Sequence, residues 1–224
     1  YDTPVGAAQK LHEKYPQVTG YCTFRQEFVV MHRGKHKREI DNAYKVTPGF
    51  DTLFQPKMIS GSLKQTLSHP LEIAITRSFA LRTFGKENPA GEVVSLETYK
   101  DVFVRNGNGC GVSQQQVCQD YTITSVIDDR QPSVLYYELL FGLSPEEIAR
   151  QPFNTSWYHS VVQVQAGSEL SVLQEEIKQG ENATPLFLLP IEQAYYTKDY
   201  SENRLFRYRD YQQLQTSLYI ALLI

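Results

Sequence analysis

The sequence predicts an α+β fold, a largely antiparallel sheet with a few packed helices, in a single domain that spans residues 1–224. Hydrophobic residues make up 41% and charged residues 21% of the chain, which is ordinary globular usage, and a chain of this length can bury a large core. Tyrosine, with 15 copies, and phenylalanine, with 11, favour strands. The strand-like segments do not alternate regularly with long helices, as a doubly wound parallel sheet requires, and no linker divides the chain.

Four segments are expected to form helices. They are Val5–Tyr15, Pro70–Phe84, Ser144–Arg150 and Ser168–Gln179. We expect Thr3 to cap the first helix and Ser144 to cap the third, because hydroxyl side chains accept hydrogen bonds from the first free N–H groups. Gly85 and Gly180 are expected to end the second and fourth helices, since glycine readily adopts the left-handed conformation found there.

The strand predictions rest on alternating or β-branched apolar residues. They cover Tyr21–Met31, Glu92–Val104 in two pieces, Val117–Ile127, Trp157–Val164, Pro185–Tyr196, Leu205–Tyr208 and Leu214–Ile224, with Val134–Leu140 left ambiguous. The basic cluster His32–Arg38 indicates a turn or strand end. Asn106–Gly111, with sequence NGNGCG, gives the strongest loop signal in the chain.

Charge and composition limit the classes of function. The net charge of −3 gives no strong attraction to nucleic acid. No run of 18 apolar residues is present, so we expect no membrane-spanning helix. The five histidines are scattered, and neither a metal site nor a bound cofactor is predicted. The chain starts at Tyr1 rather than Met, and we expect a processed, secreted or surface-associated protein, although a cytoplasmic location stays open.

The first functional hypothesis is a non-catalytic binding protein, exported or surface-acting, whose partner is another protein. Aromatic side chains provide large contact areas at low entropic cost. They gather near the end of the chain at Tyr195, Tyr196, Tyr200 and residues 206–209, with sequence FRYR. The arginines of that last segment could pair with acidic groups of a partner.

A second hypothesis starts from residues 29–34, with sequence VVMHRG, and residues 59–62, with sequence ISGS. These segments resemble the first-strand arginine motif and the Ser-x-Ser strand of NAD-dependent mono-ADP-ribosyltransferases, a family that includes toxins and effectors. The resemblance implies that Arg33 holds the phosphates of NAD, the substrate, and that Ser60 braces the site. Glu138 or Glu192 would be the catalytic carboxylate, although neither has the Glu or Gln that the family carries two residues earlier.

A third hypothesis is a cysteine-nucleophile enzyme, either a hydrolase or transglutaminase-like. Cys118 and His159 follow the cysteine-then-histidine order that resembles papain-like and transglutaminase-like families, which implies Cys118 as nucleophile and His159 as base. Cys110 is a second candidate nucleophile. The alternative is a local disulfide between Cys110 and Cys118. The sequence leaves open whether the protein is an enzyme.

Overall fold

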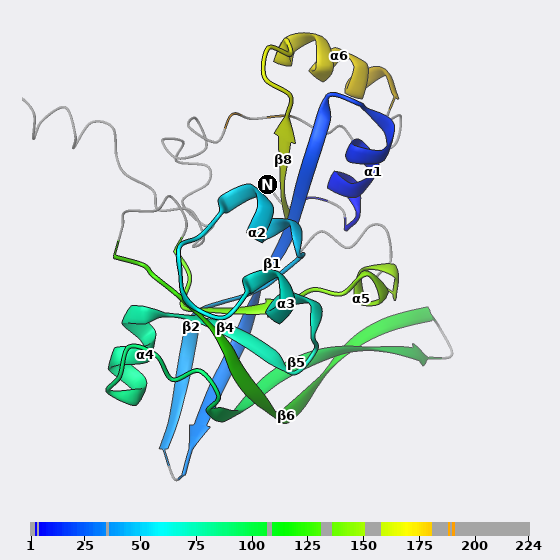
Figure 1. Cartoon of the computed structure of the whole chain (residues 1–224). Coiled ribbons are helices and arrows are strands. Elements are labelled where there is room, and N and C mark those ends of the chain that lie inside the picture. Colours follow the sequence, from blue (N-terminus) through cyan, green and yellow to red (C-terminus); the bar gives the residue numbers. More distant parts are fainter. Residues whose placement is uncertain are drawn as a thin grey trace, which may run out of the picture.

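The computed structural model describes Thr3, residues 5–34, 36–106, 109–130, 136–150 and 158–180, Leu188 and Pro190. In chain order the elements are α1 (Ala7–Lys14), β1 (Val18–Arg33), β2 (His36–Val46), α2 (Gly49–Phe54), β3 (Met58–Ser60), α3 (Leu63–Ser68), β4 (Glu72–Thr76), α4 (Arg77–Phe84), β5 (Val93–Asn106), β6 (Gly109–Ile127), β7 (Leu139–Gly142), α5 (Pro145–Arg150), β8 (His159–Val164) and α6 (Leu170–Gly180). The α+β prediction is confirmed (Figure 1).

The eight strands form one sheet whose pairings close on themselves. The order β2-β7-β4-β6-β5-β1 returns to its start because β1 also pairs with β2. β8 adds to the outer end of β1, and β3 pairs with β6. Two pairs, β2–β7 and β4–β6, are parallel and the others are antiparallel. The sheet is therefore mixed in detail, with antiparallel pairs in the majority.

β1 joins the ring to β8 because it is long enough to pair with strands of both. Residues 30–32 pair with β5 inside the ring, whereas residues 18–24 pair with β8. In Figure 1, α1 and α6 lie at the β8 end of this strand, and α4 lies toward the opposite end. The basic cluster 32–38 forms the β1–β2 turn, where Arg33 pairs with His36 and Gly34 has a φ of 61°, a conformation that glycine adopts without strain.

The largest core cluster combines buried side chains from six strands and α4. Its buried members are Val29, Met31, Ile40, Ala43, Ile73, Ile75, Phe79, Ala80, Val94, Leu96, Tyr121, Ile123, Val126, Leu139 and Phe141. A second cluster packs α2 and α3 against the strands, and a third packs α1 and α6 against β1 and β8. Burial of these apolar groups is the main force that holds the helices on the sheet.

The predicted helix Pro70–Phe84 is wrong in its first half, which forms β4. Ile73, Ala74 and Ile75 are each at most 1% exposed, so successive residues are covered on both faces, as in a buried strand of branched residues. The helix begins only at Arg77, where the Thr76 hydroxyl accepts a hydrogen bond from the Phe79 N–H at 3.3 Å.

Several boundaries also differ from the sequence predictions. Gly6, not Thr3, caps α1, and Thr3 instead bridges to Tyr158 with an N–H to carbonyl distance of 2.7 Å. Residues 93–104 belong to one strand, β5, rather than to two pieces. Asn106 and residues 109–111 of the expected loop belong to strands, because Asn106 pairs with Gly109.

Two predicted helix boundaries are confirmed, and some predicted strands fall outside the described residues. Gly85 ends α4 with a φ of 72°, and Ser144 caps α5. β2, α2, β3 and α3 were not predicted as elements. The strands expected at residues 185–196, 205–208 and 214–224 lie outside the described residues, apart from Leu188 and Pro190, and so does Trp157.

Candidate functional site

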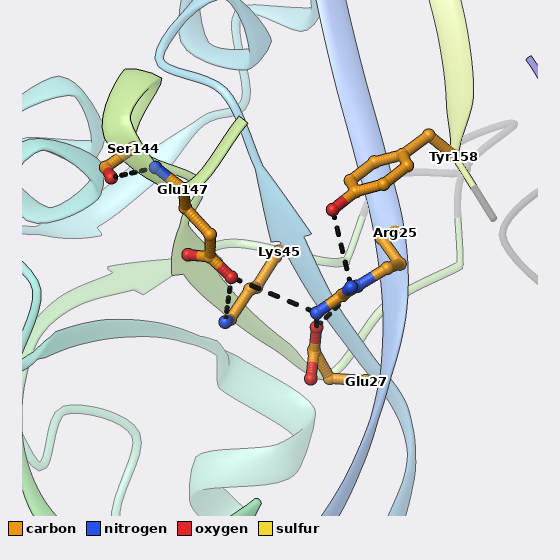
Figure 2. A network of polar contacts seen from close by, with 6 residues as sticks. All are labelled: Arg25, Glu27, Lys45, Ser144, Glu147 and Tyr158. Carbon is orange, nitrogen blue, oxygen red and sulfur yellow. Dashed lines mark hydrogen bonds and ion pairs between the residues drawn. The ribbon is translucent and has the colours of Figure 1, made fainter. Parts of the chain in front are cut away.

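A network of charged side chains links β1, β2 and α5 to Tyr158, just before β8 (Figure 2). Arg25 and Glu27 extend from β1, Lys45 from β2, and Glu147 from α5. The network holds two cations and two carboxylates, so its formal charges balance. Its side chains are 5% to 31% exposed, which places four charged groups largely out of water.

Register on the two strands brings the side chains together. Arg25 and Glu27 are two residues apart and therefore lie on one face of β1, and the Arg25 Nη2 to Glu27 Oε1 distance is 2.7 Å. Lys45 is the cross-strand partner of Arg25. Two like charges in opposite positions destabilise a sheet, so this pair needs nearby carboxylates.

Glu147 supplies the second carboxylate from α5. Its Oε1 lies 2.6 Å from Lys45 Nζ and 3.9 Å from Arg25 Nη2. The start of α5 is fixed by Ser144, whose Oγ accepts the Glu147 N–H at 3.1 Å. A cap of this kind orients the first turn of a helix and so aims the Glu147 side chain at the two cations, as Figure 2 shows.

Tyr158 contacts the network through Arg25. Arg25 Nη1 donates to the Tyr158 hydroxyl at 3.3 Å, and the Arg25 guanidinium carbon lies 5.3 Å from the centroid of the Tyr158 ring. Tyr158 is fully buried. One arginine therefore ties the chain just before β8 to the ring strands, next to the ion pair that holds α5.

Burial raises the pKa of the Glu27 carboxyl, and the nearby Lys45 and Arg25 only partly oppose that shift. A carboxylate in this state is costly to ionise. All the contacts described above join groups of the protein itself. The arrangement is therefore suited to fixing the relative positions of α5, β8 and the ring.

Three residues of the ADP-ribosyltransferase hypothesis are described, and each contacts a different partner. Arg33 donates to the Thr83 carbonyl, with its guanidinium carbon 5.4 Å from the Phe84 ring centroid. Glu138 forms an ion pair with Arg82. Ser60 Oγ donates to Asn88 Oδ1 at 2.8 Å. Glu192 and the aromatic residues 195–209 lie outside the described part of the chain.

Cys118 and His159, the pair of the cysteine-enzyme hypothesis, lie far apart on the sheet. Cys118 is on β6 and pairs with Glu97, which in turn pairs with Val30 of β1. His159 pairs with Phe24 of the same strand. Six residues of strand separate these two positions by roughly 20 Å, whereas a nucleophile and its base must be within hydrogen-bonding distance.

The local disulfide finds no support either. Cys110 and Cys118 belong to one uninterrupted strand, paired with Arg105 and Glu97 respectively. Eight strand residues span about 26 Å, far beyond the Cα separation that a disulfide bridges. Cys118 is a free, exposed thiol and Cys22 is a free, buried one. Burial raises the pKa of the Cys22 thiol to about 12.

The sequence analysis missed the charge network. One signal was available, because Arg25 and Glu27 carry opposite charges within a strand at a spacing that puts both on one face. Lys45 and Glu147 gave no comparable signal. Among the described residues, no group of three or more His, Cys, Asp or Glu side chains could hold a metal ion. In the same part of the chain, no helix has the length and apolar character needed to cross a membrane.

Comparison with solved structures identifies similar folds at low sequence identity. A domain of a putative permease protein from Porphyromonas gingivalis matches with a TM-score of 0.58 and 17% identity, over 80% of this chain and 69% of that one. The periplasmic region of MacB from Actinobacillus actinomycetemcomitans gives a TM-score of 0.55 at 12% identity, covering 91% of this chain and 85% of the other.

The extracellular domain of the noncanonic ABC-type transporter YknZ, from Gram-positive bacteria, gives a TM-score of 0.53 at 12% identity. The match covers 82% of this chain and 87% of that domain. No protein-family model and no curated protein matches the sequence. These similarities describe the fold that the chain shares with the three proteins.

Proposed function

We propose that this chain is an extracytoplasmic domain of a bacterial membrane transporter and that it binds another protein without performing chemistry itself. One observation carries the proposal: three transporter or permease domains share the fold over at least 80% of this chain. Two of them are named as periplasmic or extracellular regions. Fold similarity alone is a weak guide to function, so the proposal also needs support from this chain's own residues.

The positions of the candidate reactive residues support a binding role. Cys118 and His159 lie on different strands, and their register positions are six residues apart along β1. Arg33 and Glu138 are each engaged by a group of α4, through Thr83 and Arg82. The buried charges are used to join parts of the protein, which is what a rigid binding scaffold requires.

An aromatic pair, in which Phe28 is exposed and Tyr99 is partly buried, offers a contact surface for the partner. Phe28 on β1 is 52% exposed, and its ring centroid lies 5.8 Å from that of Tyr99 on β5. Exposed aromatic groups frequently dominate the free energy of protein association. Val172 on α6 is equally exposed, at 51%, but belongs to a different layer of the molecule.

The location is tested by thiol labelling of the full-length protein in its own cells. Cys118 is exposed and Cys22 is fully buried, so a membrane-impermeant maleimide should label intact cells through Cys118. The Cys118→Ser variant, made with and without Cys110→Ser, identifies the labelled thiol. A cytoplasmic domain would be labelled only after lysis, and that result would overturn the proposal.

The partner is tested by placing a photo-crosslinking amino acid at position 28 and, as the matched control, at position 172. We expect one defined protein adduct from position 28 and none from position 172. Equal adducts from both positions, or none from either, would contradict a specific contact at the aromatic pair.

A further inference from the structure

The hairpin of β5 and β6 extends beyond the ring as a two-stranded ribbon. β5 pairs with β1 only at residues 95–97, and β6 pairs with β4 only at residues 122–127. Within the described residues, positions 98–106 and 109–121 therefore pair only with each other, and Figure 1 shows this part projecting from the body. We call residues 98–106 and 109–121 the ribbon.

Beyond its base, where Thr98 and Tyr121 are buried, the ribbon exposes side chains of β6 on both faces. Gln115, Gln116, Cys118 and Asp120 are all exposed, although neighbouring positions along a strand point to opposite faces. A two-stranded hairpin with neither face covered is only marginally stable in water, and further strands make such a structure stable. The ribbon is thus a structural element that would gain stability from an added strand.

Hydrogen bonds at the base of the ribbon show which backbone groups face its open edge. Thr122 N–H donates to Leu71 O on the β4 side at 2.9 Å, whereas Ile123 N–H donates to Glu92 O on the β5 side at 2.9 Å. These directions alternate along an antiparallel strand, and the β5–β6 ladder has no register shift. The N–H groups of residues 114, 116, 118 and 120 consequently face away from β5.

The open edge of β6 lacks the features that normally prevent strand pairing. Proteins protect edges with lysine, proline, bulges or other charges. Residues 109–119, with sequence GCGVSQQQVCQ, contain no charged residue and no proline, whereas β5 carries Lys100, Asp101 and Arg105. Eleven strand residues give an unprotected edge about 36 Å long.

We propose that this edge of β6 pairs with the same edge of a second copy of the chain, in an antiparallel, two-fold symmetric dimer. The four strands β5–β6–β6–β5 then form one sheet across the two copies. An antiparallel arrangement places the two Asp120 side chains at opposite ends and the two ring bodies away from each other, whereas a parallel one would bring both together. The uncharged segment 109–119 pairs with itself without opposing like charges.

The dimer is tested by sedimentation and by amide hydrogen exchange across a range of protein concentrations. Mass should rise toward twice the monomer value with concentration. Amides 114, 116 and 118 should gain protection in parallel, while amides 113, 115 and 117, which face β5, stay protected throughout. This pairing does not depend on the transporter proposal, whose thiol-labelling test can succeed or fail separately.

Substitution of Gln114 separates edge pairing from ribbon folding. Gln114→Pro removes an outward N–H and no bond to β5, so we expect the dimer to weaken at least tenfold, whereas Gln114→Ala should leave it unchanged. If the proline variant does not fold, Gln114→Lys tests the same edge by placing like charges near the two-fold axis. A monomer at every concentration overturns the proposal, as does a dimer that Gln114→Pro or Gln114→Lys leaves intact. Protection of the outward amides that is independent of concentration would show that something else covers the edge.

Discussion

Replacement of Glu147 by Gln tests whether the charge network holds α5 on the ring. The substitution keeps the size of the side chain and the Ser144 cap but removes the carboxylate 2.6 Å from Lys45 Nζ. Of the two network carboxylates, Lys45 and Arg25, which are cross-strand partners, then keep Glu27. We expect lower stability, because two like charges lie in opposite positions with half of their compensation gone.

The expected loss follows from the burial of the two groups. Exposed ion pairs contribute about 0.2–1 kcal/mol, and breaking a fully buried pair costs about 3–5 kcal/mol. The Lys45 and Glu147 side chains are 17% and 31% exposed, between these limits. We therefore expect Glu147→Gln to lower the free energy of unfolding by roughly 2 kcal/mol.

A double-mutant cycle isolates this pair from other effects of substitution. Glu147→Gln, Lys45→Met and the double variant are compared by urea unfolding at neutral pH, followed by circular dichroism. The double variant should be more stable than the sum of the single losses predicts, by about 1–2 kcal/mol. A coupling free energy within about 0.3 kcal/mol of zero would refute the view that the network fixes α5.

Three further predictions concern other parts of the molecule. Because burial raises the pKa of Glu27 above its ordinary value of 4.5, its ionisation costs stability as pH rises from the unfolded pKa through the folded one; Glu27→Gln should therefore gain stability relative to the wild type as pH rises above 4.5, and a constant difference in urea midpoints would contradict this. Gly142→Ala should destabilise by several kcal/mol, since its Cβ would lie 2.0 Å from the Leu67 carbonyl oxygen, and an unchanged melting temperature would show that α3 moves freely. After incubation with labelled NAD, we expect no transfer of ADP-ribose that depends on Arg33, because Arg33 already contacts Thr83 and Phe84. Labelling that is present in the wild type and lost in Arg33→Ala would favour the transferase hypothesis.

The fold class and the ends of two helices could be predicted from the sequence. Gly85 ends α4 because glycine tolerates a φ of 72°, and Ser144 caps α5 as its position before Pro145 suggests. The segment 70–84 was misjudged because a short run of apolar residues fits a buried strand and a helix equally well. Only the tertiary structure, which covers Ile73, Ala74 and Ile75 on both sides, decides between them.

Site prediction from local motifs is ambiguous for a related reason, and the residues it names stay predictions. The transferase resemblance rested on short segments around Arg33 and Ser60, and the cysteine hypothesis on the order of Cys118 and His159. Chain order says little about separation on a sheet where β1 alone spans two sets of partners. The charge network, by contrast, depends on pairing between strands that are distant from α5 in the chain.

The long strand β1 explains why these features belong to one mechanical design. Its two halves pair with β5 and with β8, and Arg25 and Glu27 lie between those two ladders. The network therefore lies where the ring meets the β8 layer, beside the apolar cluster of Val5, Leu143 and Tyr158. The same strand places Phe28 next to Tyr99 at the root of the ribbon. β1 thus connects the aromatic pair, the charge network and the β8 ladder within one continuous strand.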